Sequence, residues 1–419
     1  MLDQAMVLRF KAPSSFTGED VVEIHCHGGI AVIDAILDAV HQIDIQSSIR
    51  PAARGEFTRR AYAAGKLGLT QVEGLADLLL ASTQIQRRQA VSILSGALER
   101  RYDSWRNQLT SLRAAAEASV DFADDIEGDV DFYQILEPTL TKAKALRNDI
   151  LASLEKGNIG MAVRNGIHIV LAGPPNAGKS SLLNKIAQRP AAIVTDTAGT
   201  TRDILQLDLT LAGFPVSLYD TAGLRTKTND PIEEEGIRRA HDALLHAHLI
   251  CYILDASCMH HEHPFHILHQ ENKNTELIFI ANKCDLLPND NPNLILQRGR
   301  AYIQDTFPSS PFFQNATWIS TIATEQDGID HLLTFLESYV QRRFSHSSNE
   351  PPAIVRQRHQ RHVLACLDHL NQAIRDFPYA PELGAEGLRL AAFELGRVVG
   401  IIDVEDVLDS LFSTFCIGK

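Results

Sequence analysis

Short apolar runs and helical periodicity alternate along this chain of 419 residues. Residues 1 to about 60 combine short apolar segments with glycine-rich turns, for example residues 21–26 before Gly28 and Gly29, a pattern typical of mixed α/β structure. From about residue 67 to 160, apolar side chains recur at helical spacing, and residues 71–136 contain no proline. This second stretch predicts a helical bundle.

Strand-like and helical segments alternate from residue 167 to about 343, which predicts a doubly wound sheet with crossover helices. A linker rich in Ser and Pro follows at residues 345–352, and helical periodicity then returns. Because we expect the last helices to pack on the earlier ones, the sheet domain is predicted to be inserted into a split helical domain. The expected fold is α/β plus all-α, and its predicted parts are an α+β N-terminal domain (1–62), a first helical part (63–160), an inserted domain (161–345) and a second helical part (346–419).

The apolar run at residues 167–172 ends in Gly-Pro-Pro-Asn-Ala-Gly-Lys-Ser at residues 173–180. Glycines at positions 173 and 178 let a backbone curl so that its amides face a polyphosphate. Lys179 can reach the outer phosphates, and Ser180 offers a hydroxyl to magnesium. A strand followed by this spacing predicts a phosphate-binding loop.

Two further motifs follow predicted strands and indicate which nucleotide binds. The motif Asp-Thr-Ala-Gly places Asp220 where it can bind the magnesium shell and Gly223 where its amide can meet a terminal phosphate. The motif Asn-Lys-Cys-Asp at residues 282–285 follows a third apolar run. Asp285 can accept both donors on one edge of guanine, whereas adenine turns a lone pair toward the same oxygens. Three motifs in this order predict GTP.

Composition narrows the remaining function classes. The chain is 45% hydrophobic and 22% charged, as in globular proteins of two or three domains. No apolar run is long enough to span a bilayer, and the N-terminus lacks a signal-peptide pattern, so we expect a cytoplasmic protein that does not contact membranes. The net charge of −13 argues against a broad basic surface, although a local patch can still bind RNA.

Hydrolysis of GTP needs a group that orients water, and the residue after Gly223 is Leu224. An apolar side chain cannot hold the water, so either hydrolysis is slow or another group does this work. Candidates are the acidic run at residues 233–235 and an internal arginine, Arg202 or Arg225. The acidic run can equally be favourable charge at a helix N-terminus.

These motifs together resemble the tRNA modification GTPase family MnmE, also called TrmE. The resemblance covers nearly the whole chain and rests on residues 173–180, 193–203, 220–225 and the terminal Phe-Cys-Ile-Gly-Lys at 415–419. It implies a Ras-like P-loop GTPase domain inserted into a split helical bundle. It also implies an N-terminal domain that dimerises and binds a tetrahydrofolate derivative.

The resemblance further implies an activity and partners. Members of the family use GTP hydrolysis, with a flavoprotein called MnmG or GidA, to install an aminomethyl or carboxymethylaminomethyl group on carbon 5 of the wobble uridine of certain tRNAs. The one-carbon unit comes from the folate. We therefore expect a GTPase that forms a homodimer, and a heterotetramer with the flavoprotein, and that acts on tRNA.

Potassium and magnesium are the ions that the resemblance implies. A potassium ion beside the phosphates can neutralise developing charge, which would account for Leu224. Glu233 would position the attacking water through a second water. The expected magnesium ligands are Ser180 and Thr201, and the expected potassium ligands are Asn176, Thr195, Thr197 and Thr200. The expected nucleotide-binding residues are Asn176, Ala177, Gly178, Lys179, Ser180, Ser181, Thr200, Thr201, Asp220, Gly223, Asn282, Lys283, Asp285 and Ser320.

The chain departs from the family pattern at two places. Members usually carry several dozen more residues before the equivalent of Met1, so we expect a partial N-terminal domain, and folate binding and dimerisation stay open. The last guanine-contacting loop usually carries Ser-Ala, whereas residues 320–323 read Ser-Thr-Ile-Ala. Backbone amides there can still serve the base.

Cys416 and a histidine-rich segment at residues 258–269 carry further hypotheses. The family places the terminal cysteine near the folate, so Cys416 either takes part in the modification chemistry or is incidental. The histidine-rich segment lacks compact ligand spacing and is interpreted as a polar insertion rather than a zinc site. The alternative function is a GTP-dependent RNA or ribosome assembly factor without modification chemistry, but residues 1–60 and the terminal motif favour the modification enzyme.

Overall fold

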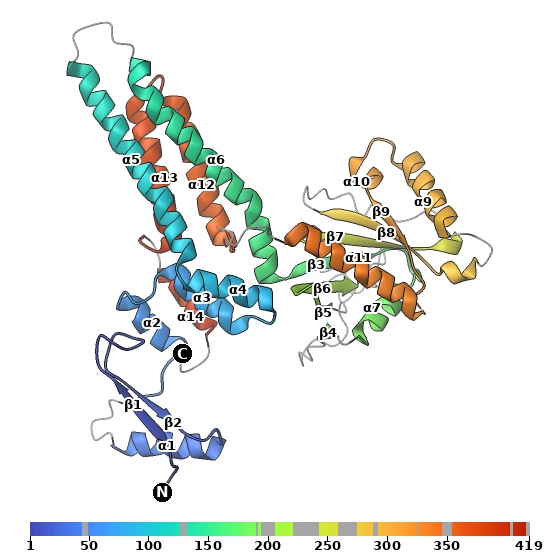
Figure 1. Ribbon diagram of the computed structural model, residues 1–419, viewed down its shortest axis with the longest axis horizontal. Coiled ribbons are helices and arrows are strands. Elements are labelled where there is room, and N and C mark those ends of the chain that lie inside the picture. Colours follow the sequence, from blue (N-terminus) through green and yellow to red (C-terminus); the bar gives the residue numbers. More distant parts are fainter. Residues whose placement is uncertain are drawn as a thin grey trace, which may run out of the picture. The chain divides into compact units, whose positions relative to one another are not determined.

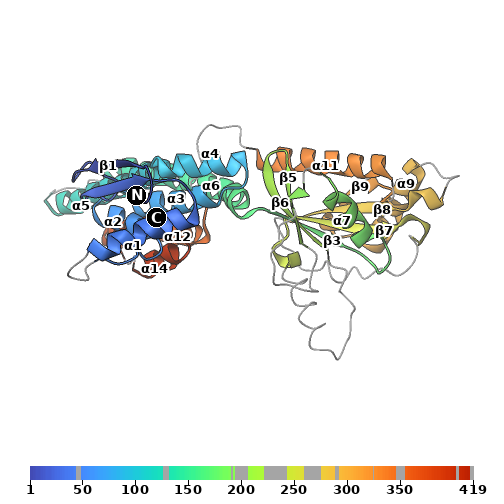
Figure 2. The same ribbon diagram turned by 90° about the horizontal axis from the view of Figure 1, so that it is seen from below.

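A computed structural model of the chain describes residues 1–43, 49–125, 132–189, 192–193, 206–220, 243–258, 275–287, 292–323, 325–345, 354–402 and 405–415. The chain divides into two compact units, drawn in Figures 1 and 2. The helical unit comprises residues 1–81, 87–160 and 350–419, and the sheet unit comprises residues 82–86 and 161–349. Among the described residues, no helix is both long and apolar enough to cross a bilayer.

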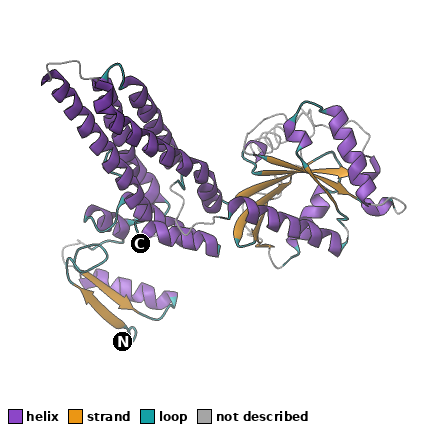
Figure 3. Ribbon diagram, turned by 45° about the horizontal axis from the view of Figure 1, so that its top comes forward, coloured by secondary structure: helices purple, strands orange, loops and turns teal. Residues whose placement is uncertain are grey.

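Long helices form the body of the helical unit (purple in Figure 3). They are α3 (Leu69–Leu80), α4 (Gln84–Leu94), α5 (Ala97–Asp125), α6 (Phe132–Asn165), α12 (Gln357–Asp376) and α13 (Pro381–Val399), of which α4 and α6 continue into the sheet unit. The buried side chains of Tyr102, Trp105 and Leu109 lie on one face of α5 at the spacing of an amphipathic helix. The indole of Trp105 donates to Asp149 of α6 at 2.6 Å, which satisfies its polar atom.

The chain leaves the helical unit and returns to it at neighbouring points. A Cβ added at Gly157, near the end of α6, would lie 2.9 Å from the Cβ of Ile354. Ile354 and Val355 are fully buried and lead into α12. The glycine therefore allows the returning segment to lie directly against the departing helix, as an inserted domain requires.

The last described helix, α14 (Glu405–Ser413), packs on α3 near the start of the chain. Their shared apolar cluster contains Leu69, Val72, Ala76, Leu408, Leu411, Phe412 and Phe415. Helix α2 (Glu56–Ala63) begins after Gly55, whose φ is 64°. A Cβ at Gly55 would come within 2.8 Å of the Phe412 ring, so a glycine is needed for both conformation and space.

A small α/β segment precedes these helices. Strand β1 (Met6–Phe10) pairs antiparallel with β2 (Val21–His25), and α1 (Ile30–Ile43) follows. Helix α1 has no buried residue. Large apolar side chains that stay more than two-fifths exposed include Met6, Val7, Val22, Ile24, Ile30, Leu37 and Ile43. This segment thus presents an apolar surface that the described part of the chain does not cover.

The sheet unit confirms the predicted doubly wound fold. Its described strands form a seven-stranded sheet in the order β4-β5-β6-β3-β7-β8-β9, parallel from β6 to β9 and antiparallel at β4–β5 and β5–β6. The strands are β3 (Ile167–Ala172), β4 (Ala192–Ile193), β5 (Gln206–Leu211), β6 (Phe214–Asp220), β7 (Leu249–Asp255), β8 (Glu276–Asn282) and β9 (Thr317–Ser320). The described helices that lie wholly in this unit include α7 (Lys179–Ala187), α9 (Pro292–Thr306), α10 (Pro311–Gln314) and α11 (Gln326–Phe344).

Residues 82–86 belong to the sheet unit, although their periodicity groups them with the helical bundle. A Cβ at Gly213, in the turn between β5 and β6, would lie 3.3 Å from Cδ1 of Ile85. The side-chain amide of Gln86 donates to the carbonyl of Arg164 at 3.1 Å. Ile85 therefore packs on the turn between β5 and β6. Its spacing along the sequence could not predict this contact, because the contact depends on tertiary structure.

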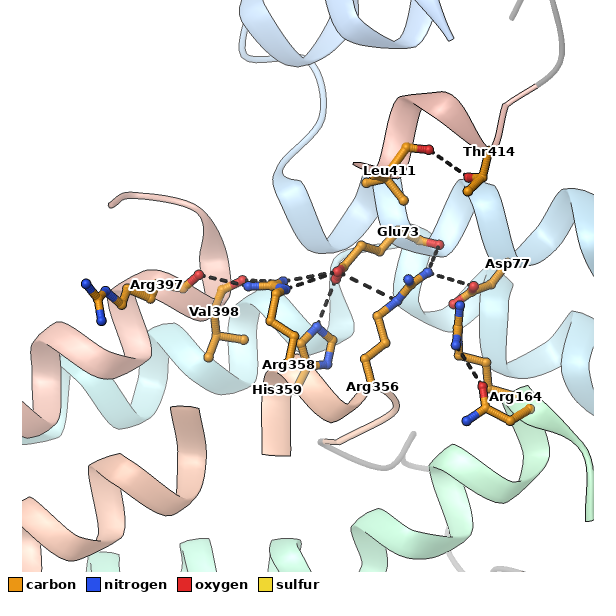
Figure 4. Close-up of polar contacts among 11 residues, drawn as sticks. Glu73, Asp77, Arg164, Arg356, Arg358, His359, Arg397, Val398, Leu411 and Thr414 are labelled. Carbon is orange, nitrogen blue, oxygen red and sulfur yellow. Dashed lines mark hydrogen bonds and ion pairs between the residues drawn. The ribbon is translucent and has the colours of Figure 1, made fainter. Parts of the chain in front are cut away.

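A buried carboxylate joins the two sequence segments of the helical unit (Figure 4). Glu73 on α3 is 4% exposed, and its two oxygens lie 3.1 Å from a guanidinium nitrogen of Arg358 and 2.8 Å from Nε2 of His359. Arg356 donates to the carboxylate of Asp77 at 2.7 Å and to the Glu73 carbonyl at 3.2 Å. We call Glu73, Asp77, Arg356, Arg358 and His359 the Glu73 cluster.

Arg358 also caps the C-terminal end of helix α13. Its guanidinium donates to the carbonyl oxygens of Arg397 and Val398 at 2.9 and 3.0 Å, in the last turn of α13. The last carbonyls of a helix lack partners within the helix. A cation at the C-terminus also interacts favourably with the negative end of the helix dipole. One side chain therefore links α3, α12 and α13.

The protonation state of the Glu73 cluster follows from its burial. Burial would raise the pKa of Glu73, but His359 and the two arginines lower it well below its usual range, so the carboxylate is charged. Burial lowers the pKa of the fully buried His359. Its Nδ1 has no hydrogen-bond partner among the described residues, which a neutral imidazole tolerates better than a buried cation would.

Replacing Glu73 with alanine should lower the free energy of unfolding by about 3–5 kcal/mol, because it leaves buried cations without their carboxylate. Chemical denaturation monitored by circular dichroism measures this change. Glu386→Ala is the matched control, since Glu386 pairs with Arg389 at 2.7 Å on an exposed surface where ion pairs add little. Equal effects of the two substitutions would contradict the assignment.

Acidification should also destabilise the helical unit. In the unfolded chain His359 takes up a proton near its ordinary pKa of 6.5, whereas in the folded chain its pKa is lower. Glu73 likewise has a pKa below its ordinary value of 4.5 in the folded chain. Since the unfolded chain binds more protons, the free energy of unfolding falls as pH decreases below about 6.5. Denaturation curves between about pH 7.5 and 5 should show a shallower pH slope for His359→Gln than for the wild type. An unchanged slope would place the titrating group elsewhere.

Candidate nucleotide-binding site

The carboxyl ends of five parallel strands place the predicted motifs at one edge of the sheet. Asp220 at the end of β6 is in register with Leu171 of β3, and Asp255 at the end of β7 is in register with Asn282 of β8. Ser320 ends β9 beside Ala281. Ligands of open α/β sheets bind at this edge, so the phosphate loop, Asp220 and the Asn282 turn converge where a nucleotide is expected.

The loop between β3 and α7 adopts a conformation that only glycine permits at two positions. Gly173 has a φ of 139°, and a Cβ there would lie 2.2 Å from the carbonyl oxygen of Ile253. Gly178 has a φ of 96°, and its Cβ would lie 2.3 Å from the side-chain amide of Asn282. Asn176, between them, is left-handed with a φ of 63°. The sequence thus folds here into the tight curl that a phosphate requires.

Lys179 is buried at the first turn of α7. Its ammonium donates to the carbonyl oxygens of Gly173 and Pro174 at 2.9 and 2.8 Å, so the side chain folds back across the loop. Burial lowers the pKa of Lys179, and nearby Asp220 opposes this shift. A cation held over a helix N-terminus can attract the outer phosphates of a nucleotide.

Ser180 and Asp220 meet beside this lysine. The Ser180 hydroxyl donates to the Asp220 carboxylate at 2.6 Å, and Asp220 is only 2% exposed. A hydroxyl and a carboxylate are hard oxygen donors of the kind that magnesium selects, and they are already adjacent. These two residues therefore fit the magnesium site expected from the sequence.

Asn282 connects the phosphate loop to the base side of the site. Its amide donates to the carbonyl of Ala177 at 2.9 Å, and its carbonyl oxygen accepts from the amide of Ala323 at 3.0 Å. Asn282 is 1% exposed, so both bonds are shielded from water. The motif predicted Asn282 as a nucleotide-binding residue, whereas its bridge to Ala323 depends on two loops that are distant in sequence.

The base-side turn carries Lys283 and Asp285. Lys283 is left-handed, with φ 61° and ψ 37°, and precedes the short helical turn η3 (Cys284–Leu286). Its ammonium lies 2.8 Å from the carboxylate of Asp255, while Asp285 is exposed. Asp255 is not among the residues expected at the site, although it ends an apolar run as Asp220 does.

Several expected site residues lie outside the described residues: Thr195, Thr197, Thr200, Thr201, Gly223, Glu233 and Cys416. Most of the histidine-rich segment, from residue 259 onward, lies outside them as well. Of the remaining expected residues, Ser181 is exposed on α7 and Ser320 is half-buried at the end of β9. Within the described ranges, no group of three or more His, Cys, Asp and Glu residues is arranged to hold a metal ion.

A glycine-curled loop, a buried lysine, a serine–aspartate pair and a guanine-type motif at one sheet edge define a P-loop GTPase. A family model described as "MnmE helical domain" matches residues 69–416, and one described as "GTP-binding protein TrmE N-terminus" matches residues 1–66. The chain belongs to the MnmE (TrmE) family of GTPases.

Two relatives illustrate the similarity. The chain is 42% identical over 421 residues to the tRNA modification GTPase MnmE of Maricaulis maris, covering 100% of this chain and 87% of that one. It is 40% identical over 431 residues to the human mitochondrial 5-taurinomethyluridine-[tRNA] synthase subunit GTPB3, covering 100% and 82%. A solved structure of Era with MgGDPNP and 16S ribosomal RNA nucleotides shares 22% identity over 41% of this chain and 55% of that one, with a TM-score of 0.31.

Proposed function

We propose that the chain is a GTP hydrolase that acts in the modification of carbon 5 of the wobble uridine of certain tRNAs. The observation that carries the proposal is similarity at 40–42% identity over the whole chain to proteins named for tRNA modification. One of these names specifies 5-taurinomethyluridine, a uridine substituted at carbon 5. Because the match includes the helical and N-terminal parts as well as the GTPase motifs, it favours the modification enzyme over an assembly factor.

The described residues account for binding of the nucleotide. Backbone N–H groups of residues 176–178 and the ammonium of Lys179 would face the phosphates, and Asp285 would accept from the donor edge of guanine. Ser180 and Asp220 would hold magnesium, which supplies charge stabilisation on the phosphate oxygens. On nucleotide binding, Lys179 would exchange its two carbonyl contacts for contacts with phosphate oxygens. Its buried ammonium would therefore have hydrogen-bond acceptors both with and without the nucleotide.

Potassium is proposed as the second ion. Asn176 is exposed at the tip of the loop and offers an amide oxygen, a donor suited to an alkali cation. Thr195, Thr197 and Thr200 would supply the remaining ligands, and Thr201 would complete the magnesium site. When bound, potassium supplies positive charge beside the phosphates where other GTPases use an arginine. Glu233 is proposed to orient the attacking water.

The proposed partners are a second copy of the chain, the flavoprotein MnmG and tRNA. The exposed apolar side chains of β1, β2 and α1 support a homodimer, because soluble proteins rarely leave such a surface uncovered. A tetrahydrofolate derivative and a chemical role for Cys416 stay proposals for this chain. The cytoplasmic location expected from the sequence also stays a prediction, since named relatives include mitochondrial proteins.

The potassium proposal predicts that GTP turnover in potassium exceeds turnover in sodium by about tenfold to a hundredfold. Asn176→Gly should remove this difference, and glycine preserves the left-handed backbone that alanine would strain. Asn184→Ala, an exposed position on α7, is the matched control and should keep the ion dependence. If wild type hydrolyses GTP at the same rate in both salts, potassium does not take part in the reaction.

The modification proposal predicts that this chain restores wobble uridine modification in cells that lack their own MnmE relative. Mass spectrometry of nucleosides from purified tRNA measures the restored modification. Lys179→Ala should abolish it, because loss of the buried cation weakens phosphate binding. A wild-type chain that hydrolyses GTP but restores no modification would contradict the proposal and favour the assembly factor.

A further inference from the structure

Asp255 and Lys283 form an ion pair at the base side of the nucleotide site. The Lys283 ammonium donates to Oδ2 of Asp255 at 2.8 Å. The other carboxylate oxygen, Oδ1, accepts from both the amide and the hydroxyl of Ser257, at 3.0 and 2.6 Å. The side chain of Asp255 is 19% exposed and that of Lys283 is 34% exposed, so both are partly shielded from water. Asp255 is thus fixed from two sides.

Lys283 is held at its other end as well. It follows Asn282, which is anchored by two buried hydrogen bonds, and it adopts a left-handed backbone at the start of η3. Because β7 and β8 are neighbours in the sheet (Figure 1), the ion pair stretches the lysine side chain across the ends of both strands. Its methylene groups therefore occupy a set position.

The same turn carries the residue that selects guanine. Asp285 lies two residues after Lys283, within η3, and its carboxylate is exposed for a ligand. A base that meets Asp285 must pass close to Lys283. A purine ring binds well to a fixed apolar surface, and the straight chain of a lysine can supply one when its charged end is anchored elsewhere.

We propose that Asp255 is a positioning residue for guanine nucleotides, which acts by holding the Lys283 side chain as a preset wall beside the base. The inference rests on the proposed guanine-nucleotide site. An unanchored lysine would lose rotamer freedom when the nucleotide binds, and anchoring it beforehand should improve affinity by about tenfold. Burial would raise the pKa of Asp255, but Lys283 and Ser257 lower it, which keeps the carboxylate charged near neutral pH.

Asp255→Asn in the full chain tests this role, since asparagine keeps the oxygen that accepts from Ser257 and loses the charge. Titration calorimetry should show an affinity for GDP that is reduced about tenfold, with an equal reduction for a non-hydrolysable GTP analogue, because the base rather than the phosphates is affected. In steady-state kinetics the loss should fall on KM and not on kcat. A loss confined to kcat would overturn the proposal.

A double-mutant cycle separates positioning from a purely structural role. Lys283→Met keeps a straight apolar chain without the charge, and in that background Asp255→Asn should change GDP affinity by less than about twofold. The matched control is Glu276→Gln, which removes the 2.7 Å ion pair with Arg343 at the opposite end of β8 and should leave GDP affinity unchanged. Additive losses in the cycle, or loss of thermal stability without loss of affinity, would show that Asp255 does not act through Lys283.

The wild-type protein distinguishes this inference from the function on which it rests. Wild type should bind GDP and should not bind ADP under the same conditions. If it binds neither, the guanine-nucleotide site and the role of Asp255 both fail. If it binds GDP and Asp255→Asn binds it equally well, the positioning role alone fails.

Discussion

The helical unit depends on a carboxylate that is buried between two segments of chain separated by the whole sheet unit. Glu73 comes before the insertion, and Arg358 and His359 come after it. A buried charge is tolerated only when its partners arrive with good geometry, so the cluster forms only when the returning segment takes one particular position on α3. Within the helical unit the returning segment is also held against α6, since Ile354 packs on Gly157 next to the start of α12.

The same rule organises the nucleotide site. Lys179, Asp220 and Asn282 are each nearly inaccessible, and each forms hydrogen bonds with residues of the phosphate loop or of the first turn of α7. These bonds connect the ends of neighbouring strands to the phosphate loop in the absence of a nucleotide. Asp255 and Lys283 extend the arrangement to the base side. Hydrogen bonds and ion pairs between the loops therefore hold the site together.

The N-terminal segment follows the opposite pattern. Its hairpin and helix carry apolar side chains that remain exposed, while the helices after Gly55 are well packed through Phe412 and Phe415. Free energy from apolar burial is thus concentrated in the bundle and the sheet. The contrast is the basis for the proposal that a second copy of the chain covers β1, β2 and α1.

The sequence by itself determined the features that depend on short spacing. The phosphate-binding loop, the three motifs after their strands and the fold class were all predictable, because a strand, a glycine turn and a helix N-terminus lie within a few residues of one another. Tertiary structure alone decided the pairing of Glu73 with Arg358 and His359, the bridge from Asn282 to Ala323 and the anchoring of Lys283 by Asp255. It also decided that Ile85, in a segment of helical periodicity, packs on the β5–β6 turn. Each of these contacts joins residues that are far apart in sequence, and local periodicity carries no information about which distant chain will bury a given polar or apolar side chain.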